Sequence, residues 1–265
     1  MRHHILALTA VFAASPALFA ADWNKTYNVA AAPVLDVRSS DANVDIKAGS
    51  GNVISARVTT RGWEIKPGEI EVIERQQGDR VDIEVRHPRR SFNWESLGGD
   101  RWVRIEVTVP AQTRLHVNTG DGNVSLSGVR SELRVETGDG NITGDNLDGR
   151  LEARTGDGNI RVSGRFDAAT LNTGDGNVEL TAATGSTSGG IWRVHTGDGN
   201  VKLRVPSTLR ADIDAVCGDG HISSDLPITL ASGKIGTHQL RGKLNGGGPT
   251  VTVRTGDGNI SLTRN

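Results

Sequence analysis

The sequence has few of the residues that cross-link small exported proteins or fill an ordinary globular core. Among its 265 residues are a single cysteine, Cys217, and ten aromatic side chains. One cysteine excludes an intrachain disulfide, and so few rings argue against a core built on large aromatic side chains. Stability must therefore come from backbone pairing and from the packing of aliphatic residues.

The chain also lacks a long hydrophobic run and an excess of charge of either sign. An apolar stretch covers residues 5–14, and no later segment approaches the roughly 20 apolar residues that a transmembrane helix needs. The formal net charge is −1, so the basic excess typical of nucleic-acid-binding proteins is missing. We therefore expect no transmembrane segment in the mature chain and no nucleic-acid partner.

Residues 1–20 are typical of a secretory signal peptide. A short basic start, Arg2-His3-His4, precedes the apolar stretch, and Leu18-Phe19-Ala20 fits a cleavage site. We expect the mature protein to begin near Ala21 and to be periplasmic or secreted. Because no cysteine follows the signal directly, lipid anchoring at that point is excluded.

Glycine, in contrast, is abundant, and much of it lies in a repeated motif. The chain has 34 glycines among its 265 residues, whereas glycine makes up roughly 7% of an average protein. The sequence Thr-Gly-Asp-Gly-Asn, followed by Val or Ile, begins at Thr119, Thr137, Thr155, Thr173, Thr196 and Thr255, and a degenerate copy begins at Cys217. The first four copies are 18 residues apart, and the later spacings are 23, 21 and 38. The spacing predicts an 18-residue repeat with insertions.

Apolar residues alternate with polar ones on both sides of each motif. Leu133 and Val135 precede Thr137, and Ile142 follows it. Alternation with period two predicts short strands that bury one face. Between the strands, Gly-Asp-Gly predicts a tight corner, in which glycine supplies a positive φ and Asp hydrogen-bonds the nearby backbone.

Two all-β architectures fit this pattern. One is a series of antiparallel hairpins that turn at Asp-Gly. The other is a parallel β-solenoid, or β-helix, with about 18 residues per coil and about 4.8 Å between coils. The second would place opposite charges side by side in three pairs, Arg134 with Glu152, Glu136 with Arg154, and Arg161 with Glu179. Because neighbouring strands favour such pairs, the sequence favours the solenoid.

The same register places the motif threonines and Cys217 in one column that points inward. Cys217 is then a buried replacement for threonine rather than a reactive thiol. Residues 111–265 form the predicted repeat solenoid. Residues 21–110, where 41–46 look like an eroded copy of the motif, are expected to add irregular first coils or a less regular N-terminal β cap to the same continuous domain.

Several of these segments together resemble a bacterial family of unknown function labelled "putative adhesin". The likeness rests on the strand at 105–110 that ends in Val-Pro, the recurrent Thr-Gly-Asp-Gly-Asn-Ile units, and the glycine-rich segment 242–249 with the closing motif at 251–260. It covers roughly residues 30–265. The resemblance implies a β-helix-like fold at the cell envelope and transfers no catalytic residue.

Stacking of the repeats also predicts a column of carboxylates. Its regular part consists of Asp121, Asp139, Asp157 and Asp175, and Asp198, Asp219 and Asp257 continue it. These aspartates either close their own turns, with a neighbouring ladder of amides formed by Asn123, Asn141, Asn159 and Asn177, or bind calcium between coils. Calcium β-rolls carry a Gly-Gly-x-Gly-x-Asp unit every nine residues, whereas this chain has one Gly-Asp-Gly per 18, so the pattern favours turn closure. We expect no metal and no cofactor.

One segment is a candidate for partner binding. Arg89, Arg90, Phe92 and Trp94, with Trp102 just beyond them, combine rings and guanidinium groups. Such a group stacks on sugar rings or anchors a protein partner. Alternatively, the rings fold back and cover an open edge of the strands.

The sequence predicts an exported, non-enzymatic envelope or surface-interaction protein whose partner is an envelope glycan or protein. A catalytic site is singular and pushes the pKa values of two groups apart, whereas the aspartate column repeats one environment. We therefore assign no catalytic residue. The alternatives are a β-helix enzyme that acts on polysaccharide and a calcium-binding repeat protein.

Overall fold

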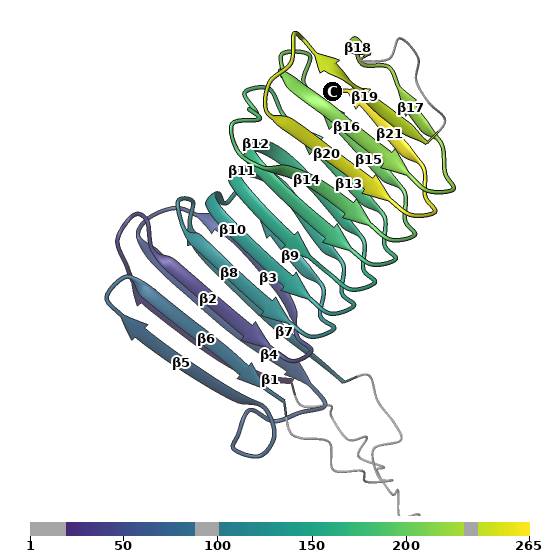
Figure 1. The fold of residues 1–265 in the computed structure, drawn as a ribbon. Coiled ribbons are helices and arrows are strands. Elements are labelled where there is room, and N and C mark those ends of the chain that lie inside the picture. Colours follow the sequence, from purple (N-terminus) through teal and green to yellow (C-terminus); the bar gives the residue numbers. More distant parts are fainter. Residues whose placement is uncertain (1–19, 88–100, 231–237) are drawn as a thin grey trace, which may run out of the picture.

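The protein is an all-β stack of strands. The computed structural model describes residues 20–87, 101–230 and 238–265, and these residues form 21 strands in one hydrogen-bonded network and no helix. Figure 1 shows an elongated molecule in which successive strands lie side by side along one axis. The all-β prediction is confirmed.

The pairings divide the strands into two opposed faces, which we call face A and face B. The long strands β11 (Ile142–Arg154) and β12 (Ile160–Thr173) run from face B into face A. Face A contains, in spatial order, β5 (Glu71–Gln77), β6 (Arg80–Arg86), β2 (Val34–Ser39), β8 (Arg114–Thr119), β10 (Arg130–Thr137), the second parts of β11 and β12, β14 (Trp192–Thr196), β20 (Thr250–Thr255), β16 (Ala211–Cys217), β19 (Gln239–Leu244) and β18 (Ile228–Leu230). Face B contains β1 (Ala20–Asn28), β4 (Val53–Arg61), β7 (Trp102–Pro110), β3 (Asn43–Gly49), β9 (Val124–Ser127), the first parts of β11 and β12, β13 (Val178–Ala182), β15 (Val201–Val205), β21 (Ile260–Arg264) and β17 (Ile222–Ser224).

Residues 18 positions apart pair in parallel through the middle of the stack. Thr119 pairs with Thr137, and Ile142 pairs with Ile160. The predicted charge pairs also adjoin, with 3.0 Å between Arg161 Nε and Glu179 Oε2. The register that the sequence predicts is therefore confirmed, as are the two other pairs, Arg134 with Glu152 and Glu136 with Arg154.

At the C-terminal end, the order of the repeats in space differs from their order in the sequence. Thr255 pairs with Thr196 on one side and with Cys217 on the other. The last repeat, β20 and β21, thus lies between two repeats that precede it in the chain, as Figure 1 shows for these yellow strands. The expectation that Asp198, Asp219 and Asp257 follow one another in the column in this order is wrong. Asp257 lies between the other two, because β20 pairs with β14 on one side and with β16 on the other.

A similar insertion occurs at the N-terminal end. Strand β2 precedes the eroded motif and β3 contains its second half, and Ser39 pairs with Thr119 while Val44 pairs with Val124. On their other side, β2 and β3 pair in parallel with β6 and β7. Beyond these strands the pairing becomes antiparallel, in β1, β4 and β5 at this end and in β18 and β19 at the other.

The space between the faces is filled mainly by Val, Ile and Leu, which alternate with exposed residues along each strand. The motif threonines point inward and are at most 8% exposed, and Cys217 is 2% exposed, as predicted. Tyr27, Phe166 and Trp192 add aromatic side chains to the core, and the ring centroids of Phe166 and Trp192 lie 6.5 Å apart in an edge-to-face arrangement. Aliphatic packing thus supplies most of the core.

The motif glycines serve close packing rather than an unusual φ. A Cβ added at Gly158 would overlap the carbonyl oxygen of Gly140, and one at Gly140 would overlap that of Gly122. No described motif glycine has a positive φ, whereas Gly128 (72°) and Gly185 (90°) in the looser turns do. The expected positive φ at Gly-Asp-Gly is therefore wrong. Glycine is needed there because the preceding repeat leaves no room for a side chain.

We predict that Gly158→Ala destabilises the protein by about 1–3 kcal/mol, because the added methyl group must displace the backbone of the neighbouring repeat. Gly189→Ala is the matched control, since the nearest atom to a Cβ there, Thr187 Oγ1, lies 3.7 Å away. Its effect should stay within about 0.5 kcal/mol. Urea unfolding of both variants measures the difference, and equal midpoints would contradict the packing argument.

Candidate functional site

The corner of each repeat is tied to the next by the motif threonine. The hydroxyl of Thr155 lies 3.1 Å from the carbonyl oxygen of Gly138 and 2.8 Å from that of Gly140, and it donates to them. The same hydroxyl accepts from the amide of Gly158 at 3.2 Å. Thr137, Thr173, Thr196 and Thr255 donate to the equivalent pair of carbonyls. A buried hydroxyl thus satisfies backbone groups of two repeats at once.

A ladder of asparagine amides runs along the outside of the corners. Asn141 Oδ1 accepts from the backbone amide of Asn159 at 2.9 Å and from its Nδ2 at 3.0 Å. The predicted amide ladder is confirmed and extends further, through Asn43, Asn123, Asn141, Asn159, Asn177, Asn200 and Asn259 to the amide of His221. Its order follows the spatial order of the repeats, including the inserted last one.

The motif aspartates form the predicted column and are exposed. Asp121, Asp139, Asp157 and Asp175 stand in consecutive repeats, and within the described ranges their carboxylates receive no hydrogen bond. Threonine and asparagine, rather than aspartate, therefore bind the corner backbone. In the part of the chain that the structure describes, no group of three or more His, Cys, Asp or Glu side chains is arranged to hold a metal ion.

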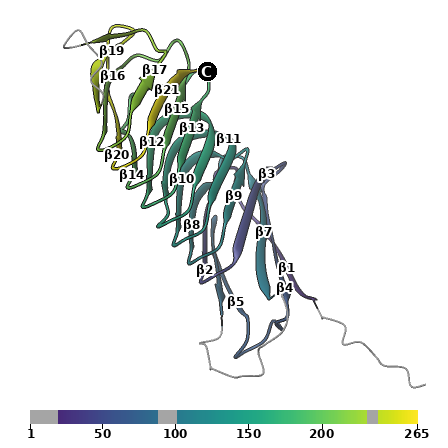
Figure 2. The ribbon, with the colours of Figure 1, turned by 90° about the vertical axis from the view of Figure 1, so that its right-hand side faces the viewer.

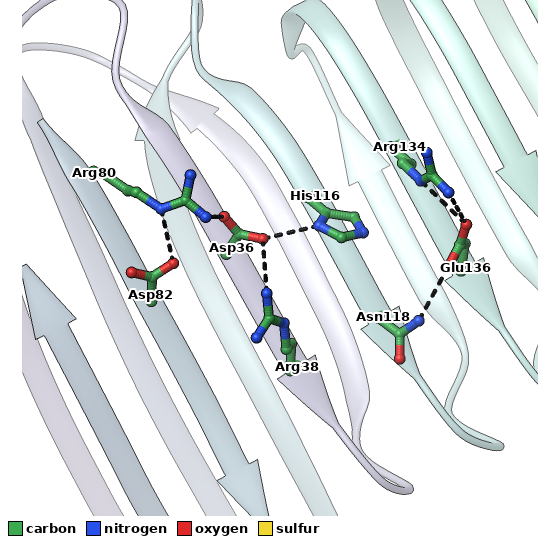
Figure 3. A network of polar contacts seen from close by, with 8 residues as sticks. All are labelled: Asp36, Arg38, Arg80, Asp82, His116, Asn118, Arg134 and Glu136. Carbon is green, nitrogen blue, oxygen red and sulfur yellow. Dashed lines mark hydrogen bonds and ion pairs between the residues drawn. The ribbon is translucent and has the colours of Figure 1, made fainter.

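A cluster of polar side chains lies on face A around Asp36 (Figure 3). Asp36 lies on the outer side of β2, yet its side chain is only 5% exposed. Arg80 on β6 donates to one carboxylate oxygen of Asp36, and His116 Nδ1 on β8 lies 2.8 Å from the other. Arg38 Nη2 lies 3.7 Å from the second oxygen. We call these four residues the Asp36 cluster.

The Asp36 cluster joins strands that are far apart in the sequence. Its carboxylate bridges β6, β2 and β8, and so it holds the inserted strand β2 on both sides. The sequence alone singles out neither Asp36 nor His116. No local sequence pattern predicts the cluster. Its members meet only because the fold pairs residue 36 with residue 82 on β6 and with residue 116 on β8.

The opposite end of face A carries a comparable arrangement around Asp214 on β16. Arg254 on β20 donates to one of its carboxylate oxygens, and Arg241 Nε on β19 donates to the other at 3.0 Å. The side chain of Asp214 is 24% exposed. Both points at which strands pair out of sequence order are thus held by one aspartate between two cationic or imidazole side chains.

The Asp36 carboxylate is more deeply buried than the acids in the ion pairs of the regular repeats. There, Glu136 accepts from Arg134 Nη2 at 2.7 Å on its own strand and from Asn118 Nδ2 at 3.2 Å on the strand before it, as Figure 3 shows. The guanidinium group of Arg134 holds the pKa of Glu136 below its ordinary value. Such pairs are partly exposed and follow the repeat, so they contribute modestly to stability.

The predicted partner-binding residues are only partly placed. Trp102 is half-buried at the start of β7, and the guanidinium carbon of Arg104 lies 5.9 Å from its ring centroid. Arg89, Arg90, Phe92 and Trp94 lie outside the described residues. Among the described residues, no helix is long and apolar enough to cross a membrane.

Comparison with known proteins gives a family. Residues 34–263 match the family model described as Toastrack DUF4097. A "putative adhesin" from Parabacteroides merdae is 10% identical, with 91% of this chain and 95% of that chain covered and a TM-score of 0.43. A "putative cell adhesion protein" from Clostridium sporogenes is 12% identical, with 92% and 100% covered and a TM-score of 0.41. A "putative lipid binding protein" from Parabacteroides distasonis is 13% identical, with 91% and 96% covered and a TM-score of 0.40. Among curated proteins, none matches the chain.

We predict that Asp36→Ala destabilises the protein by about 1–3 kcal/mol, because Arg80 and His116 lose a shared, buried acceptor. The control is Asp82→Ala, which removes a 34% exposed carboxylate that is 3.1 Å from Arg80 Nε. It should cost less than about 1 kcal/mol. Denaturant unfolding compares the two variants, and an equal loss would show that the Asp36 cluster has no special role.

Asp214 should make the protein sensitive to acid. Burial tends to raise the pKa of Asp214, but the guanidinium groups of Arg254 and Arg241 outweigh it and hold the pKa below its ordinary value of 3.8. The folded state therefore binds fewer protons than the unfolded state, and this stabilisation is present above pH 3.8 and lost as the pH falls through the folded pKa. Unfolding free energies measured at descending pH should fall less steeply for Asp214→Asn than for the wild type. Identical slopes would contradict this assignment.

Proposed function

Because the chain belongs to the Toastrack DUF4097 family, we propose that it is an exported, non-enzymatic protein that binds a partner at the cell envelope or cell surface. The observation that carries this proposal is the regular stack itself. Its two outer faces present rows of exposed polar side chains about 4.8 Å apart, on strands whose backbone is paired throughout the middle of the stack. A rigid surface of this kind suits binding to an extended partner.

The fold assignment within this proposal is a parallel β-solenoid of 18-residue coils with a less regular N-terminal β cap. Parallel pairing at 18-residue intervals and the inward threonine column support it. The antiparallel strands β1, β4 and β5 support a cap over residues 21–110. Export is supported by the signal-like pattern of residues 1–20, which places the mature protein in the periplasm or outside the cell.

A binding role accounts for the polar groups better than an enzymatic one. The motif carboxylates repeat one exposed environment, whereas acid–base catalysis uses groups in different environments. The Asp36 carboxylate, which is the most buried one described, is already bound by Arg80 and His116. These arrangements stabilise the stack and leave the outer rows for recognition.

The test combines fractionation with binding. The full chain should be recovered outside the cytoplasm, and a variant without residues 1–20 should stay inside. Purified protein from residue 21 onward should bind an envelope fraction saturably and release no soluble sugar from it. Failure to bind, or retention of the full chain in the cytoplasm, would contradict the proposal. Released sugar would instead favour an enzyme that acts on polysaccharide.

A further inference from the structure

The outer surface of face B is hollowed near the N-terminal end of the stack. An open groove of about 500 Å³ crosses five strands, β1, β4, β7, β3 and β9. Figure 2 shows these strands adjoining at that end of the molecule. At about 4.8 Å between strands, the groove extends about 19 Å across the sheet.

Two parallel rows of outward side chains line the groove. Each row consists of residues that pair with one another across neighbouring strands. The first row is rich in hydroxyl groups and consists of Thr26, Ser55, Thr108, Lys47 and Ser127. The second row carries one cation and two neighbouring anions and consists of Asn24, Arg57, Glu106, Asp45 and Ser125. Each of the five strands thus contributes two outward side chains to these rows, and all of them are polar.

Neighbouring ion pairs hold part of the second row in place. Two nitrogens of the Arg57 guanidinium group, Nε and Nη2, donate to the carboxylate of Asp22 at 2.8 to 3.1 Å. Asp45 Oδ2 lies 3.4 Å from Arg104 Nε. Lys47 and Glu106, in contrast, are exposed and make no hydrogen bond or ion pair with another described residue. The groove therefore combines positioned groups with a donor and an acceptor that are open to a ligand.

The chemistry of the lining excludes two classes of partner. The apolar residues at the groove, such as Ile46 and Val107, point into the core and are 2% exposed, so the groove lacks the aromatic or aliphatic anchors of a protein interface. Outward Lys47 and Arg57 are balanced by Asp45 and Glu106, so it also lacks the positive field that attracts a polyanion.

We propose that this groove binds an uncharged glycan whose sugar rings follow one another across the strands. Sugar hydroxyls both donate and accept, which matches carboxylates that accept, an ammonium that donates, and serine and threonine hydroxyls that do both. The length of a pyranose unit in an extended chain is close to the spacing of strands, so successive rings meet successive strands. This inference rests on the proposed function, because it names the class and the place of the partner.

The experiment measures binding of uncharged oligosaccharides of glucose, mannose and N-acetylglucosamine by calorimetry. Glu106→Gln removes an acceptor charge and should weaken binding about tenfold, since a hydrogen bond to a charged group is lost. Ser127→Tyr fills one end of the groove and should weaken binding at least as much. Ser223→Tyr is the matched control, because Ser223 is also exposed on face B but lies on β17 at the far end. The affinity of this variant for the oligosaccharides should stay within about twofold of that of the wild type.

The outcomes separate this inference from the proposed function. If the wild type binds the envelope fraction and both groove variants bind equally well, the groove proposal fails while the proposed function stands. Binding to the envelope fraction that survives periodate oxidation of its sugars, but not its treatment with protease, would show a protein partner and overturn the glycan proposal. If the wild type binds neither envelope nor oligosaccharide, both proposals fail. Unchanged melting temperatures of all three variants exclude misfolding as the cause.

Discussion

The structure depends on the close approach of backbones at the Gly-Asp-Gly corner. There, the amide of Gly138 donates to the carbonyl oxygen of Gly120, and Gly156 repeats the contact with Gly138. Only glycine permits this approach, because a Cβ would overlap the neighbouring carbonyl. Once the corners are in contact, the strands on both sides must pair in register, the threonines must point inward, and the asparagines must meet on the outside.

The ends of the stack cannot use this contact in the same way, and they are built differently. Near each end, a strand pairs with a strand from a distant part of the chain. At the C-terminal end β20 pairs with β16, and at the N-terminal end β2 pairs with β6. Asp36 and Asp214 hold these junctions, and antiparallel strands continue the faces beyond them. Covering strands protect a repeat protein from pairing with other chains, and the antiparallel strands at the ends lie where such a cover is needed.

The sequence predicts the middle of the fold better than its ends or its surface. Period-two alternation and the 18-residue spacing determine which residues adjoin, and so the Arg161–Glu179 pair and the asparagine ladder are readable in advance. The position of β20 and the groove on face B depend on which distant strands meet, which local patterns do not encode. The expected positive φ of the motif glycines is wrong because a turn and a tight backbone contact both select glycine, and only the neighbouring repeat distinguishes them.

The regular corners form the scaffold, and in the proposed function the wide polar faces meet the partner. The most direct test of this account is hydrogen exchange of the corner amides in the native protein. The amides of Gly138, Gly156 and Gly174, which donate to the preceding repeat, should exchange as slowly as those of the buried strands. If they exchange as fast as the amide of Gly185 in a looser turn, the corner contact is not what holds the stack together.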